Sequence, residues 1–111
     1  MELTVRQTTE FRRGLKRAKK RNLPESELWT VVEMLKKQIP LPARYKDHAL
    51  TGNYKGKREC HIRPDWLLIY QIKDTTLELL LTETGSHSEL FGNSLKVDAA
   101  KVVRNALMAM R

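Results

Sequence analysis

The spacing of apolar residues predicts two helices near the start of the chain. Residues 2–6 alternate between apolar and polar side chains, which is the period of a short strand with one solvated face. Apolar residues at helical spacing follow over residues 11–18 and again over residues 28–39. The two runs are separated by residues 22–26, which include a proline, and the second ends before Pro40. We therefore expect an antiparallel helical hairpin.

The pattern changes to that of strands in the second half of the chain. Residues 57–62 alternate, residues 66–72 form a nearly continuous apolar run, and residues 77–81 follow after a short turn. These segments predict a meander of antiparallel strands whose middle strand is the most buried. The expected fold is thus α+β, a small antiparallel sheet with the N-terminal helical hairpin packed on one face. Residues 42–56 and 85–92 are expected to be irregular.

A chain of 111 residues has the length of a single domain. We divide it into a body of residues 1–92 and a C-terminal helical extension of residues 93–111, which carries apolar residues at helical spacing. This extension is expected to dock on the body, and a partner-binding helix is the alternative.

Positive charge dominates the composition. There are 21 Lys and Arg against 13 Asp and Glu, a formal net charge of +8, which favours a polyanion or an acidic protein as partner. Seven of the cations fall within residues 11–21. A second group lies between residues 44 and 63, with aromatic side chains interleaved, and its members are Arg44, Lys46, Lys55, Lys57, Arg58 and Arg63, with Tyr45, Tyr54 and Trp66. Cations bind phosphates and aromatic faces stack on unpaired bases, so this second group predicts an RNA-binding surface.

Several classes of protein are disfavoured. No apolar run approaches the length of a membrane span, and the first residues lack the apolar core of a secretory signal, so we expect a cytoplasmic protein without membrane contact. Cys60 is the only cysteine, which excludes an internal disulfide. Because no paired Cys or His residues have metal-ligand spacing and no phosphate-binding glycine loop is present, we expect neither a metal nor a small-molecule cofactor.

All three histidines lie outside the expected helices, in short polar clusters that bracket the strands. They are His48, His61 and His87, and Asp65 follows the second of them closely. Imidazole suits proton transfer near neutral pH. RNA cleavage needs a base for the 2′-hydroxyl, positive charge for the phosphate and an acid for the leaving 5′ oxygen. Histidines beside a basic aromatic surface therefore predict an RNA-cleaving site that requires no metal.

Three motifs carry a resemblance to a known family. The segments YKDH, GNYKGKRECHIRPDWLLIY and TGSHSELFG together resemble the RelE/ParE superfamily of bacterial toxins, and most closely its YafQ-type mRNA interferases. The resemblance covers about residues 1–92. It implies a small sheet backed by two N-terminal helices, cleavage of mRNA in the ribosomal A site, and neutralisation by an antitoxin of a type II toxin–antitoxin pair, for which the basic surface predicts an acidic partner.

The resemblance also implies roles for individual residues. His48, His61, Asp65 and His87 match the proton-transfer and positioning residues, with His87 as the candidate acid and His61 or His48 as the base. Trp66 and Phe91 match aromatic residues that shape the site or hold a base.

One position departs from the family pattern. The family has arginine where this chain has Glu83, four residues before His87. An arginine there would neutralise charge developing on the scissile phosphate, whereas a glutamate repels it. We therefore expect this chain to bind RNA less well and to cleave it far more slowly than its relatives.

Two alternatives from other classes remain open. One is a non-catalytic toxin or binding module that acts on a protein target such as gyrase, as ParE-like relatives do. The other is a nonspecific RNA-binding protein that uses the basic first helix. The grouping of three histidines with the PDW motif argues against a pure binding module, because such a module does not need titrating groups.

Overall fold

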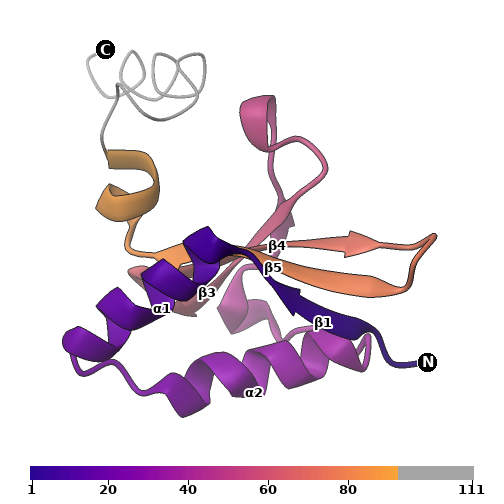
Figure 1. The fold of residues 1–111 in the computed structure, drawn as a ribbon, viewed down its shortest axis with the longest axis horizontal. Coiled ribbons are helices and arrows are strands. Elements are labelled where there is room, and N and C mark those ends of the chain that lie inside the picture. The colour runs from indigo at the N-terminus through magenta and orange to yellow at the C-terminus, as the bar shows by residue number, and fades with distance from the viewer. Residues whose placement is uncertain (93–111) are drawn as a thin grey trace.

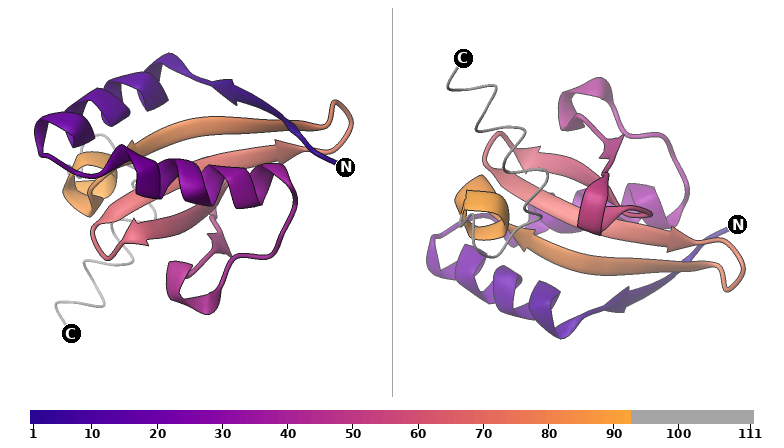
Figure 2. Two further views of the ribbon diagram at one scale, coloured as in Figure 1. Left: turned by 90° about the horizontal axis from the view of Figure 1, so that it is seen from below. Right: turned by 90° about the horizontal axis from the view of Figure 1, so that it is seen from above.

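The computed structural model describes residues 1–92, which form a five-stranded sheet with two helices on one face (Figures 1 and 2). The spatial order of the strands is β1-β5-β4-β3-β2. Their bounds are β1 Thr4–Gln7, β2 His48–Ala49, β3 Arg58–Arg63, β4 Trp66–Lys73 and β5 Glu78–Gly85, and the helices are α1 Thr9–Lys20 and α2 Glu25–Lys36. Three short helical turns complete the described part, η1 Ala43–Tyr45, η2 Gly52–Tyr54 and η3 Ser88–Gly92.

The sheet is mixed rather than purely antiparallel. Strands β2, β3, β4 and β5 pair antiparallel, as the short turns between β3, β4 and β5 require. Strand β1, however, pairs parallel with β5, with Thr4 opposite Glu78. Both helices separate β1 from the other strands in sequence, so the connection allows β1 to pair with a later strand in either orientation. The alternation in residues 2–6 does not indicate the orientation. The α+β class is confirmed, and the expectation of an antiparallel sheet is corrected at this edge.

Helices α1 and α2 cover one face of the sheet, as expected. The N–H of Phe11 donates to the Thr8 side chain at 2.9 Å, which caps the start of α1. Phe11, Leu28 and Val31 are fully buried in the core that the helices share with the sheet. Helix α2 ends at Lys36, and Ile39, which the apolar spacing placed in it, lies beyond its end and is exposed.

The opposite face of the sheet carries a smaller core. Leu67 and Ile69 of β4 pack there against Leu50 and against Leu90 of η3. Strand β4 is thus covered on both faces, which explains its continuous apolar sequence. The segment between β2 and β3 and the turn η3 both rise from this face, on the side away from the helices (Figure 1).

One prediction needs correction, and another concerns residues that the structure does not describe. Residues 42–56, expected to be irregular, contain η1, η2 and the two-residue strand β2. The expected C-terminal helix falls in residues 93–111, outside the described residues. Within residues 1–92, neither helix is long and apolar enough to cross a bilayer.

Candidate active site

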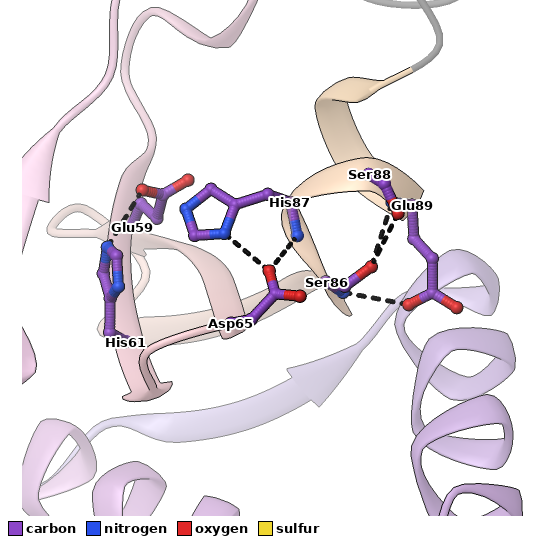
Figure 3. Close-up of polar contacts among 7 residues, drawn as sticks. All are labelled: Glu59, His61, Asp65, Ser86, His87, Ser88 and Glu89. Carbon is purple, nitrogen blue, oxygen red and sulfur yellow. Dashed lines mark hydrogen bonds and ion pairs between the residues drawn. The ribbon is translucent and has the colours of Figure 1, made fainter.

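His87 is held between the end of β5 and the start of η3 by Asp65. One carboxylate oxygen of Asp65 accepts both the backbone N–H of His87, at 2.8 Å, and ring nitrogen Nδ1, at 2.6 Å (Figure 3). Both hydrogen bonds lower the pKa of Asp65 below its ordinary value, and the bond from the backbone N–H has the larger effect. An ionised carboxylate only accepts, so Nδ1 carries the hydrogen and Nε2 is left to exchange a proton. The His87 side chain is about half exposed, so a substrate can reach it.

The other two histidines share a buried carboxylate, Glu59. One oxygen of Glu59 lies 3.3 Å from Nε2 of His48 and 3.7 Å from Nε2 of His61. Among residues 1–92 its second oxygen has no hydrogen-bond partner, and the residue is only 5% exposed. A buried carboxylate without full hydrogen bonding is costly to stability, and such groups are typical of functional sites. Glu59 was not among the residues predicted for the site, although it alternates with His61 on one strand.

The three imidazoles form a row on the face of the sheet away from the helices. Ring centroids are 6.4 Å apart for His48 and His61, and 5.5 Å apart for His61 and His87. The strand register explains the arrangement, because cross-strand partners share a face. His48 pairs with Glu59, and His61 pairs with Leu67, which belongs to the smaller core on this face. The structure thus brings together the four residues predicted to transfer protons.

A reciprocal capping box orders the turn that carries His87. The backbone N–H of Ser86 donates to the Glu89 carboxylate at 2.9 Å, and the backbone N–H of Glu89 donates to the Ser86 hydroxyl at 3.1 Å (Figure 3). The second oxygen of Glu89 pairs with Arg21 at 3.0 Å and with Arg17 at 3.4 Å. This turn is therefore tied to α1 as well as to Asp65, and the S-x-x-E spacing is the signal that could have revealed it.

Glu83 lies on the same face as the histidines. It is the cross-strand partner of Ile69, which in turn is the partner of Glu59. Partial burial raises the pKa of Glu83, and a hydrogen bond from Tyr54 opposes that shift. Burial, followed by the charge of Glu83, raises the pKa of Tyr54 to about 12, and the Tyr54 ring packs edge-on against Phe91 at 5.5 Å. Phe91 and Tyr54 are half-buried on this face, where the prediction placed an aromatic surface.

Two of the predicted base-stacking aromatics are placed elsewhere. Trp66 is 1% exposed in the core beneath the helices, and its indole N–H donates to the Thr84 hydroxyl at 3.0 Å. Tyr45 is also buried in that core, with the guanidinium of Arg44 over its ring at 4.6 Å. The burial of both rings disfavours direct stacking on a base, and for Trp66 it favours the other predicted role, which is to shape the site.

The predicted basic surface is divided between the two sides of the sheet. Arg58 shares a face with Cys60 and Tyr70 of the larger core, opposite the histidines, and it pairs with Asp47 at 3.2 Å. Arg63 is exposed and forms a two-pronged pair with Glu27 of α2 at 2.8 and 3.0 Å. A cleft of about 520 Å³ next to this pair is lined by residues that include Arg44 and His61. The remaining predicted cations, Lys46, Lys55 and Lys57, lie in the segments flanking β2.

Within residues 1–92, no three or more His, Cys, Asp and Glu side chains are grouped so that they could hold a metal ion.

Comparison with known proteins identifies the family. The family model for the bacterial toxin of type II toxin–antitoxin systems, YafQ, matches residues 3–92. The mRNA interferase toxin YafQ of Escherichia coli K12 is 39% identical over 84 residues, which span 75% of this chain and 89% of that protein. The putative toxin YafQ of Haemophilus influenzae is 40% identical over 92 residues, which span 78% and 90% of the two chains.

Solved structures agree with this sequence similarity. The E. coli DinJ–YafQ toxin–antitoxin complex matches with a TM-score of 0.74 and 36% identity, over 82% of this chain and 99% of the other. A metal-bound toxin from Helicobacter pylori matches with a TM-score of 0.76 and 45% identity, over 80% and 99% of the two chains. The chain therefore belongs to the YafQ family of bacterial toxins from type II toxin–antitoxin systems.

Proposed function

We propose that this chain is a ribosome-dependent mRNA endoribonuclease whose activity is limited by Glu83. The observation that carries the proposal is the row of three imidazoles on one face, with Asp65 2.6 Å from His87 and Glu59 between His48 and His61. A curated relative of 39% identity is an mRNA interferase toxin, which supports the same activity. Action on the ribosome would place the protein in the cytoplasm.

The proposed reaction uses the 2′-hydroxyl of the RNA as nucleophile. His48 or His61 accepts the 2′-hydroxyl proton, and the oxygen attacks the adjacent phosphorus. The P–O5′ bond breaks, and His87 donates its Nε2 proton to the leaving 5′ oxygen. The products are a 2′,3′-cyclic phosphate and a 5′-hydroxyl; the base histidine has gained one proton and His87 has lost one. Asp65 keeps the His87 ring turned so that Nε2, rather than Nδ1, meets the leaving group.

Glu83 opposes this reaction electrostatically. Negative charge accumulates on the phosphate oxygens in the transition state, and a positive group at that point is worth several kcal/mol. Glu83 sits on the catalytic face, and Arg13 and Arg17 of α1 line a small cleft beside it. A carboxylate there repels the phosphate and competes for those guanidinium groups. We therefore expect Glu83 to slow RNA cleavage by this chain.

The antitoxin partner follows from membership of the family, and its chemistry is part of the proposal. We expect an acidic segment that lies over the basic catalytic face and blocks access to His87. Binding should weaken as salt concentration rises, since exposed charge pairs steer the association.

The test compares translation-dependent mRNA cleavage by this chain and by its Glu83→Arg variant. We expect the variant to cleave about 10²–10³ times faster, the range that one charge-stabilising group provides. The matched control adds His87→Ala to the arginine variant, which should abolish cleavage while leaving antitoxin binding intact. If neither the chain nor the arginine variant cuts mRNA although both fold and reach the ribosome, the proposal is wrong. Growth arrest with intact mRNA and inhibited gyrase would also contradict it.

A further inference from the structure

Asp47, Arg58 and Tyr70 form a polar cluster on the face of the sheet opposite the histidines. Arg58 donates to the Asp47 carboxylate from Nε at 3.3 Å and from a terminal nitrogen at 3.2 Å. The hydroxyl of Tyr70, a residue only 1% exposed, donates to the other oxygen of Asp47 at 2.5 Å. Burial and the Asp47 hydrogen bond raise the pKa of Tyr70, so its hydroxyl stays a donor at neutral pH. The mechanism above uses none of these three groups.

Two members of the cluster are sequence neighbours of the site residues His48 and Glu59. Asp47 directly precedes His48, and Arg58 directly precedes Glu59. Successive residues of an extended chain point to opposite faces. The Asp47–Arg58 pair therefore joins the two segments on the helix face, while His48 and Glu59 are cross-strand partners on the catalytic face. Whatever holds Asp47 against Arg58 also holds His48 against Glu59.

Strand β2 needs such support because it contributes little of its own. It comprises His48 and Ala49, pairs only with β3 in the described sheet, and has exposed side chains. The residue before Asp47, Lys46, has a φ of 50°, in the left-handed region that a non-glycine residue adopts at a cost. A two-residue ladder cannot by itself fix this backbone, whereas a two-pronged charged pair with a buried tyrosine partner can.

The orientation of the His48 ring depends on the same short stretch of backbone. Its Nδ1 lies 2.7 Å from the carbonyl oxygen of Lys46. A carbonyl oxygen only accepts, so Nδ1 carries a hydrogen, and Nε2 is the nitrogen that gains or loses the second proton. Nε2 lies 3.3 Å from a carboxylate oxygen of Glu59, which accepts a hydrogen bond from it when the ring is protonated.

We propose that the Asp47–Arg58–Tyr70 cluster is a positioning clamp that holds His48 with its hydrogen on Nδ1, so that Nε2, beside Glu59, is the nitrogen that exchanges a proton. The clamp acts from the far side of the sheet and touches no substrate. Its effect on the ring is a property of the free protein, whereas its effect on catalysis rests on the proposed function.

The first test measures the His48 tautomer in the free protein from ¹⁵N chemical shifts of the histidine ring. We expect neutral His48 to be mainly Nδ1–H in the unmodified chain. Asp47→Asn and Arg58→Met should shift it towards Nε2–H, the tautomer free imidazole side chains favour in water. The control is Lys55→Met, which removes the same charge from the exposed loop and should leave the tautomer unchanged. Retention of Nδ1–H in both cluster variants would overturn the proposal.

If the Asp47 and Arg58 variants fail to fold, Tyr70→Phe provides the same test. It removes a single hydroxyl from the cluster while keeping the buried ring. A partial shift towards Nε2–H is expected, and an unchanged tautomer in a folded Tyr70→Phe protein would refute the clamp.

The second test separates positioning from RNA contact in the Glu83→Arg background. Arg58→Met should lower kcat about 100-fold with little change in KM, because misplacing a reacting group by about 1 Å costs that much. Lys55→Met should instead raise KM and leave kcat nearly unchanged. A raised KM with intact kcat for Arg58→Met would make Arg58 an RNA contact and overturn the clamp. If the Glu83→Arg protein does not cut RNA at all, the proposed function fails while the tautomer measurement still decides this inference.

Discussion

Replacing Gly14 by alanine should destabilise the protein, although helix propensity alone predicts the opposite. Gly14 lies within α1, where alanine is favoured over glycine by about 1 kcal/mol. In the structure, however, a Cβ on Gly14 would lie 2.0 Å from the backbone carbonyl oxygen of Thr84 and 3.2 Å from its methyl group. Real Cβ atoms essentially never approach closer than 3.0 Å, so α1 and β5 would have to separate by about 1 Å.

The expected cost follows from what the new methyl group meets. Overpacking in a close-packed interior typically costs about 1–3 kcal/mol, and the upper end applies because a strand carbonyl cannot rotate away as a side chain can. After subtraction of the gain in propensity, the net loss in free energy of unfolding is about 2 kcal/mol. For a domain of this size, each kcal/mol lowers Tm by roughly 4–8 °C.

Urea unfolding followed by far-UV circular dichroism measures this change directly. Lys16→Ala on the exposed side of the same helix is the matched control, and its free energy of unfolding should stay within about 0.5 kcal/mol of the unmodified chain. A Gly14→Ala protein at least as stable as the unmodified chain would show that the contact with the Thr84 carbonyl does not exclude a Cβ at position 14. Because Thr84 lies three residues before His87, the same substitution in the Glu83→Arg background should also slow cleavage.

Two further predictions concern carboxylates of the catalytic face. Asp65→Asn in the Glu83→Arg background should slow single-turnover cleavage about 100-fold, because the Nδ1–H of His87 loses its ionised partner. Asp74→Asn in the exposed β4–β5 turn is the control, and equal rates for both would contradict the role of Asp65. Glu83→Gln should raise the free energy of unfolding at neutral pH. The folded-state pKa of Glu83 is raised, so ionisation as pH rises through that pKa weakens the unmodified chain. The advantage of the variant should disappear below the ordinary pKa of 4.5, and an advantage that is independent of pH in urea titrations would exclude this cause.

The residues of the candidate site could be predicted in part from their positions along β3. Glu59 and His61 are separated by one apolar residue, so simple alternation places them on the same face. The same alternation puts Arg58 with Cys60 and Ile62 on the helix face, yet Arg58 was assigned to RNA by its charge alone. Charge and residue type predicted a polyanion as partner, but the alternation of side chains along β3 decides which cations share a face with the histidines.

Other features of the site could not be read from the sequence. The apolar run of β4 gives no sign of which face each residue occupies, because both faces are covered. Whether Trp66 stacked on RNA or filled the core depended on the register between β4 and β5, where it donates to Thr84. The approach of Gly14 to the carbonyl of Thr84 is likewise a contact between segments that lie 70 residues apart in the chain.

The helical hairpin, the buried middle strand and the histidines proposed for catalysis were predicted from the sequence, because they depend on local periodicity or on residue type. The departure at Glu83 was apparent only from the resemblance to the family. Other features were visible only in the folded protein: β1 runs parallel to β5, Glu59 lies between two histidines, and Asp47, Arg58 and Tyr70 meet behind His48. These features arise from the packing of segments distant in sequence, and sequence spacing does not record which of them come into contact.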